Sequence, residues 1–109
     1  REDTKLFCTY YLAINLGNQA RFSGKLSEDE KKALNKESLK LLKQLNDDPK
    51  VAQVSKSLAD RVASVIFEKE NLSIGSPAPD IVGDDHTGTV FKLSDYRGKV
   101  VLLDFWGYW

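Results

Sequence analysis

An apolar run near the C-terminal end of the chain constrains the fold most strongly. Residues 100–106, Val-Val-Leu-Leu-Asp-Phe-Trp, are β-branched or large and apolar, apart from the carboxylate of Asp104. Such a run is typical of a strand that is covered on both faces, rather than of a strand with one solvated face. We therefore expect a core strand here, with neighbouring strands and a covering layer.

Three helices are predicted before this run by apolar residues that recur every three or four positions. The first spans residues 3–20, and we expect Gly24 to end it in a left-handed conformation. The second begins after Ser27, which forms a capping-box pattern with Glu30, and runs to about residue 46. Pro49 interrupts it, and a third helix is expected over residues 51–70. The predicted inward-facing residues are Leu6, Tyr10, Ala13, Ile14, Gly17 and Ala20, then Leu34, Leu41, Leu42 and Leu45, then Val51, Val54, Leu58, Val62, Val65 and Ile66.

The character of the chain changes at residues 72–79, where two prolines flank Ala78 and favour extended backbone. We place a domain boundary here, between a helical region over residues 1–72 and a second domain over residues 73–109. The second domain is expected to begin with a β-hairpin, whose strands lie over residues 80–83 and 90–93 and whose turn contains Gly88. Residues 94–98 are expected to close one helical turn. The predicted fold class is α+β.

Composition and charge exclude several classes of partner. The 109 residues contain 16 Lys and Arg and 16 Asp and Glu, so no net charge favours binding to nucleic acid or to an anionic membrane. No stretch reaches the roughly 18 apolar residues of a membrane-spanning helix. The chain begins at Arg1 without an initiator methionine and stops inside a predicted strand. We therefore expect it to be a piece of a longer protein.

Cysteine and histidine each occur once. A single cysteine, Cys8, forms neither an intrachain disulfide nor a cysteine-based metal site, and its apolar helical surroundings favour a buried thiol over a reactive one. His86 stands beside Asp84 and Asp85 in the predicted hairpin turn. A turn stabilised by aspartate side chains is favoured here over a metal or acid–base site. We expect neither a metal nor a cofactor.

Three segments together resemble the opening of a thioredoxin-like redoxin domain, most closely that of the TlpA/ResA-type thiol–disulfide oxidoreductases. The segments are Gly75-Ser76-Pro77-Ala78-Pro79-Asp80, then Gly88-Thr89-Val90-Phe91-Lys92-Leu93-Ser94-Asp95-Tyr96-Arg97-Gly98-Lys99, then residues 100–109. They occur in the family's order and spacing, and the resemblance covers residues 73–109. It implies that residues 100–106 are the first core strand of a truncated thioredoxin-like α/β domain. In that family a Cys-x-x-Cys motif follows, which places its first cysteine directly after Trp109.

The resemblance also implies roles for three residues near that motif. Asp104 aligns with a buried carboxylate that accepts a proton behind the redox-active cysteines; an aspartate that reaches solvent or a backbone donor is the alternative. Trp106 and Trp109 align with tryptophans that flank the motif. Core packing is the alternative for both, and Trp109 is the more strongly expected to act at the site, because it would precede the nucleophile.

The resemblance implies that the protein reduces or exchanges protein disulfides without a cofactor. It also implies a bacterial protein located outside the cytoplasm, either periplasmic or anchored to the membrane and facing outward. The chain as it stands lacks both active-site cysteines, so we expect it to be inactive by itself. A peroxiredoxin-like (AhpC/TSA) thiol peroxidase, with antioxidant activity, is the first alternative, since it shares the Ala78-Pro79-Asp80 opening. A helical interaction module that carries a degenerate redoxin segment is the second alternative. It would need no cysteine after Trp109.

Overall fold

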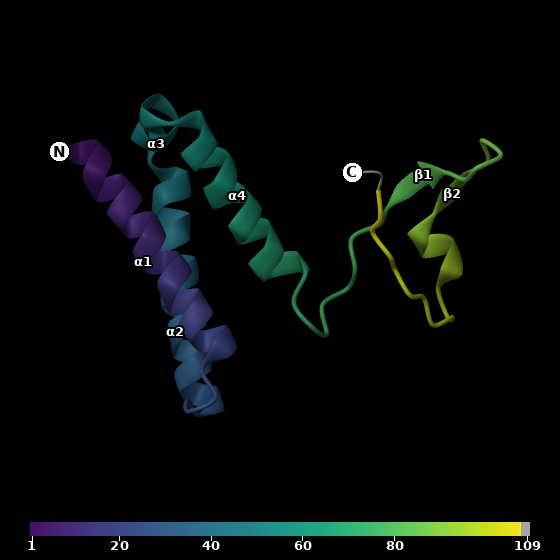
Figure 1. The fold of residues 1–109 in the computed structure, drawn as a ribbon, viewed down its shortest axis with the longest axis horizontal. Helices are drawn as coiled ribbons and strands as arrows, with labels where there is room; N and C mark the ends of the chain where they lie inside the picture. The colour runs from purple at the N-terminus through teal and green to yellow at the C-terminus, as the bar shows by residue number, and fades with distance from the viewer. Residues whose placement is uncertain (108–109) are drawn as a thin grey trace. The chain divides into compact units, whose positions relative to one another are not determined.

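The computed structural model describes residues 1–107. The chain divides into two compact units, Arg1–Ser76 and Pro77–Trp109. The first unit is helical, and the second contains a two-stranded antiparallel hairpin and a short 3₁₀ helix (Figure 1). This arrangement confirms the predicted α+β class with a helical N-terminal region.

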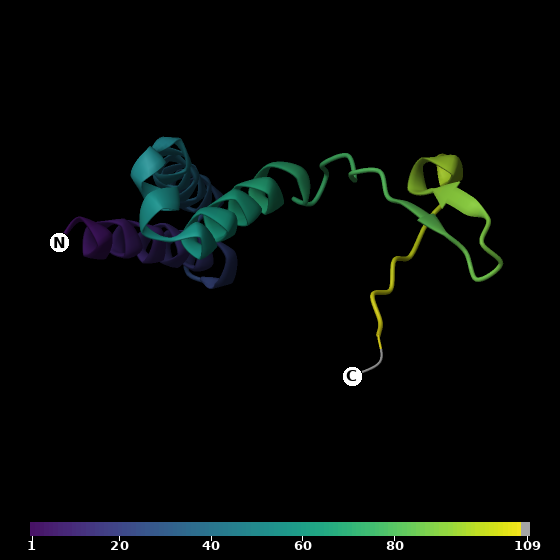
Figure 2. The same cartoon turned by 90° about the horizontal axis from the view of Figure 1, so that it is seen from above.

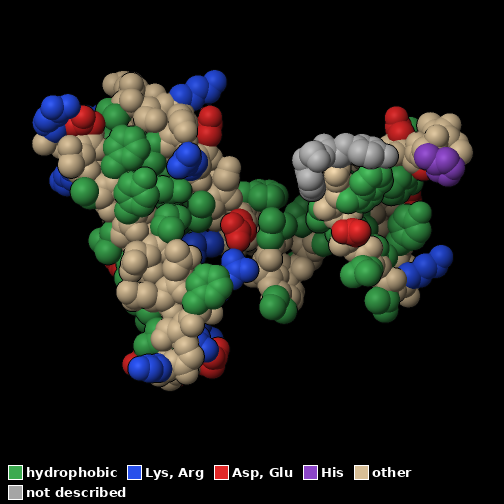
Figure 3. Space-filling model, viewed as in Figure 1, with side chains coloured by type: hydrophobic (Ala, Val, Ile, Leu, Met, Phe, Trp, Pro, Cys, Tyr) green, Lys and Arg blue, Asp and Glu red, His purple; other side chains and the backbone are tan. Residues whose placement is uncertain are grey.

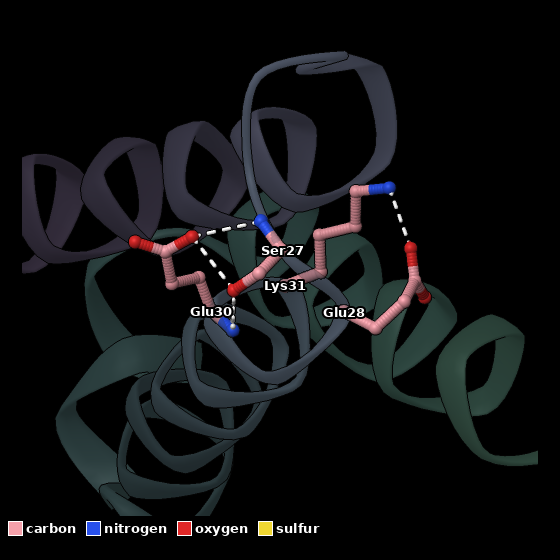
Figure 4. A network of polar contacts seen from close by, with 4 residues as sticks. All are labelled: Ser27, Glu28, Glu30 and Lys31. Atoms are coloured by element: carbon pink, nitrogen blue, oxygen red, sulfur yellow. Dashed lines mark hydrogen bonds and ion pairs between the residues drawn. The ribbon is translucent and has the colours of Figure 1, made fainter.

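The first two helices lie where the sequence predicts them. Helix α1 spans Glu2–Phe22 and helix α2 spans Glu28–Asp47. At the start of α2, the Ser27 hydroxyl accepts a hydrogen bond from the Glu30 amide (3.3 Å), and the Ser27 amide donates to the Glu30 carboxylate (2.7 Å), as Figure 4 shows. These reciprocal bonds confirm the predicted capping box, which satisfies amide groups that have no partner within the helix.

The third predicted helix is two helices in the structure. Helix α3 spans Pro49–Val54 and helix α4 spans Lys56–Asn71. Between them Ser55 is extended, with φ −159° and ψ 109°, and its hydroxyl accepts a hydrogen bond from the Leu58 amide at 3.2 Å. The prediction of one continuous helix was wrong because the apolar spacing continues across Ser55, whereas serine caps the N-terminus of a new helix.

The core of the helical unit lies between α1, α2, α3 and α4. Helix α2 packs against both α1 and α4, and α3 packs against α4 (Figure 2). One buried polar side chain joins two of these helices, since the Ser38 hydroxyl donates to the Ala13 carbonyl oxygen at 2.7 Å. The buried apolar core residues are all among those predicted to face inward: Tyr10, Ala13, Leu42, Leu45, Val51, Leu58 and Val62.

Two predictions for the first helix were wrong. Cys8 is exposed rather than buried. It lies two residues before Tyr10, and a turn of about 100° per residue places these two side chains on opposite sides of the helix. Helix α1 ends at Phe22, its C-cap Ser23 has a φ of −77°, and Gly24 is not among the glycines with positive φ.

The second unit begins with the predicted hairpin. Strand β1 (Val82–Asp84) pairs antiparallel with β2 (Val90–Lys92), and Gly83 lies opposite Phe91. In the turn, the Asp85 carboxylate accepts from the Thr87 and Thr89 amides at 2.8 and 3.0 Å. Gly88 has a φ of +83°, a value that glycine adopts without steric cost. The 3₁₀ helix η1 (Leu93–Tyr96) follows β2 directly.

The predicted core strand over residues 100–106 is not formed in the structure. A strand requires a hydrogen-bonded neighbour, and among the described residues β1 and β2 pair only with each other. The apolar side chains of this segment are consequently exposed, for example Leu102 at 94% and Phe105 at 83%. They add to the apolar surface that Figure 3 shows on this unit.

Candidate functional site

The redoxin-like segments are joined by a hydrogen-bonded pair, Asp80 and Ser94. The amide and the hydroxyl of Ser94 each donate to a different oxygen of the Asp80 carboxylate, both at 2.8 Å. Beside this pair, the Leu93 amide donates to the Ile81 carbonyl oxygen at 2.9 Å. The hydrogen bonds from Ser94, the side-chain one first, lower the pKa of Asp80. An ionised Asp80 thus holds the start of the unit against the turn after β2.

The turn after β2 fixes the direction in which the chain leaves the hairpin. The Lys92 amide donates to the Asp95 carboxylate at 2.9 Å, and the Lys99 amide donates to the Tyr96 carbonyl oxygen at 3.1 Å. Gly98 has a φ of +84°, which a residue with a side chain rarely adopts. The Ser94-to-Gly98 segment, which carries part of the family resemblance, therefore forms a turn that sets the direction of the chain after it.

An aromatic pair supports the same turn. The rings of Phe91 and Tyr96 meet edge to face, with their centroids 6.4 Å apart. Edge-to-face contacts of this kind are favourable beyond the area that they bury. Phe91 and Tyr96 thus connect strand β2 to η1 through side chains as well as through the backbone.

Of the three predicted site residues, Asp104 and Trp106 lie in the exposed segment after this turn. Asp104 is exposed, and Trp106 is 74% exposed. The burial expected for Asp104 is not seen, since residues 100–107 are all exposed. Trp109 lies outside the described residues. The proton-accepting role of Asp104 and the flanking roles of Trp106 and Trp109 stay predictions.

The other candidate residues lie apart from this segment. Cys8 belongs to helix α1, and His86 is exposed in the β1–β2 turn. No group of three or more metal-ligating side chains occurs among the described residues. Within residues 1–107, no helix has the length and apolar character needed to cross a membrane.

Sequence reasoning missed the contact between Asp80 and Ser94. Both residues belong to the motifs that carry the redoxin resemblance, but the motifs do not indicate which of their side chains meet. Their co-occurrence at a fixed separation is the one signal in the sequence that points to a contact. The residue types alone do not predict the contact, because a serine at the start of a short helical turn and an aspartate before a strand occur together in many folds without a hydrogen bond between them.

Comparison with known proteins supports the resemblance. The chain is 49% identical over 47 residues to the thiol-disulfide oxidoreductase ResA of Geobacillus thermodenitrificans, 55% over 42 residues to ResA of Geobacillus kaustophilus, and 48% over 46 residues to ResA of Bacillus subtilis. These alignments cover 43%, 38% and 42% of this chain, and 27%, 24% and 26% of the respective relatives.

The chain thus spans about a quarter of the length of the curated relatives that it matches. No protein-family model and no solved structure matches it. The relatives confirm the resemblance stated from the motifs: over about two fifths of its length, this chain is similar to the ResA-type redoxins of the thioredoxin-like superfamily.

Proposed function

We propose that this chain is the opening part of a ResA-type thiol–disulfide oxidoreductase whose Cys-x-x-Cys motif follows Trp109 directly. The observation that carries the proposal is the identity of 48–55% to three relatives that bear the name thiol-disulfide oxidoreductase ResA. The Asp80–Ser94 hydrogen bonds support it, because they join two of the three segments in which the family resemblance lies.

In the proposed reaction, the first cysteine of the longer protein attacks a substrate disulfide as a thiolate. A mixed disulfide forms and one substrate thiolate leaves. The second cysteine then attacks the sulfur of the first, which releases the other substrate thiol and leaves a disulfide in the enzyme. A dithiol donor returns the enzyme to its reduced form. The helix N-terminus at which the motif begins favours the thiolate of the first cysteine.

Asp104 is proposed to accept the proton of the second cysteine. A carboxylate that is covered by the rest of the domain has a raised pKa, which suits it to accept a proton near neutral pH. Trp106 and Trp109 are proposed to shape the surface around the first cysteine and to exclude water from it. Each of these roles requires the covering elements of a complete redoxin domain.

The proposed substrates are protein disulfides, and the proposed location is outside the cytoplasm of a bacterial cell. Disulfides persist in extracytoplasmic compartments, so an enzyme that reduces or exchanges them finds its substrates there. The chain itself contributes the hairpin, the turn and residues 99–109, but neither of the two cysteines.

The test is insulin-disulfide reduction by the full-length protein with dithiothreitol as the donor. We expect turnover above the rate of dithiothreitol alone, and loss of that turnover when serine replaces the first cysteine of the motif. Asp104→Asn should slow release of the second substrate thiol more than formation of the mixed disulfide. Residues 1–109 alone should give only the background rate. Background turnover by the reduced, folded full-length protein would contradict the proposal.

A further inference from the structure

A groove in the helical unit contains a partly buried cation, Lys69, that forms no ion pair with any residue that the structure describes. The groove, which we call the Lys69 groove, lies between α1, α2 and α4 and has a volume of about 720 Å³. Four cations line it, Arg21, Lys31, Lys32 and Lys69, together with the carboxylates of Glu28 and Glu68. On this unit Figure 3 shows basic and acidic side chains close together beside apolar ones.

Both carboxylates of the Lys69 groove are already paired. Glu28 accepts from Lys31 at 2.7 Å, and Glu68 lies 3.8 Å from Arg21. Among the described residues, Lys32 and Lys69 form no ion pair. The groove therefore has a net charge of +2 from its side chains, within a chain whose overall charge is zero.

Lys69 is held in the groove rather than extended into water. Its ammonium donates to the Asn35 side-chain oxygen at 3.3 Å, and it lies 2.9 Å from the position that a Cβ on Gly17 would occupy. Partial burial lowers the pKa of Lys69, and Glu68 only partly opposes this shift. One neutral acceptor at 3.3 Å leaves two of the three ammonium hydrogens available to a ligand.

Apolar side chains lie beside these cations. Ile14 on α1, Val65 on α4 and Leu72 after α4 line the same groove. A ligand that satisfies both parts has an anionic group for Lys69 and an aliphatic body for these side chains. A carboxylate fits one or two ammonium donors, and a short alkyl chain fits the volume.

We propose that the Lys69 groove binds small aliphatic carboxylates, with Lys69 as the residue that binds the carboxylate. The inference is independent of the redox proposal, because Lys69 and the apolar side chains beside it lie in the helical region over residues 1–72. Octanoate is the probe of choice. Acetate tests the carboxylate without the alkyl chain, and octanol tests the alkyl chain without the charge.

The experiment is an NMR titration of the isotope-labelled 109-residue chain at pH 7. Octanoate should shift the amide signals of Gly17 and Asn35 and the side-chain signals of Lys69 at a common midpoint. Octanol and acetate should each bind at least about tenfold more weakly, which corresponds to loss of one charge-assisted hydrogen bond or of the apolar contact. The Lys69 side chain should titrate at a higher pH with octanoate than without it.

Three variants complete the test. Lys69→Gln should weaken octanoate binding about tenfold, whereas Lys69→Arg should retain it, because arginine keeps the charge and donates to carboxylates. Lys36→Gln removes an exposed lysine of α2 outside the groove and should leave the affinity unchanged. Circular dichroism checks that each variant keeps its helices. Equal affinity for octanoate and octanol, or wild-type affinity in folded Lys69→Gln, would overturn the proposal.

Discussion

Asp80 and Ser94 lie 14 residues apart, and the amide and hydroxyl of Ser94 both donate to the Asp80 carboxylate at 2.8 Å. This pair closes the segment that contains the hairpin, because Asp80 precedes β1 and Ser94 follows β2. It also joins the Pro-Ala-Pro-Asp segment to the Leu-Ser-Asp-Tyr segment, so two motifs of the redoxin resemblance have one structural explanation.

The Asp80–Ser94 pair predicts a pH dependence for the second unit. The pKa of Asp80 is lowered from its ordinary value of 3.8 by hydrogen bonds from Ser94. A lowered pKa means that the ionised form stabilises the fold above pH 3.8 and that this contribution is lost as the pH falls through the folded-state pKa. Carboxyl ¹³C NMR should show Asp80 titrating below 3.8, with the Ser94 amide signal moving at the same midpoint.

Ser94→Ala is the matching variant. It removes the hydroxyl donor and should raise the pKa of Asp80. The pKa of Asp85 is also lowered, chiefly by the Thr87 hydroxyl, and should stay where it is in this variant. An Asp80 midpoint that is the same in Ser94→Ala and in the wild type would contradict the assignment.

The second prediction concerns the buried hydrogen bond between α2 and α1. Ser38→Ala removes the donor to the Ala13 carbonyl oxygen and should lower the free energy of unfolding of the helical unit by about 1 kcal/mol. Urea unfolding followed by far-ultraviolet circular dichroism measures the change. Ser64→Ala is the control, since the Ser64 hydroxyl also donates to a backbone carbonyl but is exposed. Equal effects of the two substitutions would show that burial is not what makes the Ser38 bond matter.

The break between α3 and α4 gives the third prediction. Ser55→Ala removes the side-chain acceptor for the Leu58 amide and should cost about 1 kcal/mol of unfolding free energy. Ser57→Ala, two residues further along, removes an exposed hydroxyl inside α4 and should be neutral or slightly stabilising. If Ser55→Ala is as stable as Ser57→Ala, Ser55 does not cap α4.

The fourth prediction concerns Cys8. Because its side chain is exposed on α1, the thiol should react with Ellman's reagent in the folded chain at nearly the rate seen in urea. A thiol that reacts only after unfolding would show that Cys8 is buried, as its apolar sequence neighbours suggested. Cys8→Ser should be close to neutral for stability, because an exposed side chain contributes little packing.

Local patterns in the sequence predicted most of the elements. The capping box of Ser27 and Glu30, the spacing of Tyr10 and Ala13, and the turn glycine Gly88 each act within a few residues, so the sequence contains the whole interaction. The apolar period across residues 51–66 did not reveal the break at Ser55, because a periodic core face and an interrupted backbone are compatible.

Features that depend on tertiary partners were not predictable in the same way. Residues 100–106 have the composition of a core strand, yet composition supplies no hydrogen-bonded neighbour, and the segment is exposed here. The expected burial of Asp104 depends on the same missing partners. The Lys69 groove was also not predicted, since Gly17, Asn35 and Lys69 come from three different helices, and their contact depends on how these helices pack.

The central claim is that the chain leads directly into a redox-active Cys-x-x-Cys motif. The most direct test is to sequence the gene from the codon for Trp109 onward. The account predicts cysteine at the first and fourth codons after Trp109. Residues other than cysteine at both codons would contradict it and would favour a binding module built on a degenerate redoxin segment.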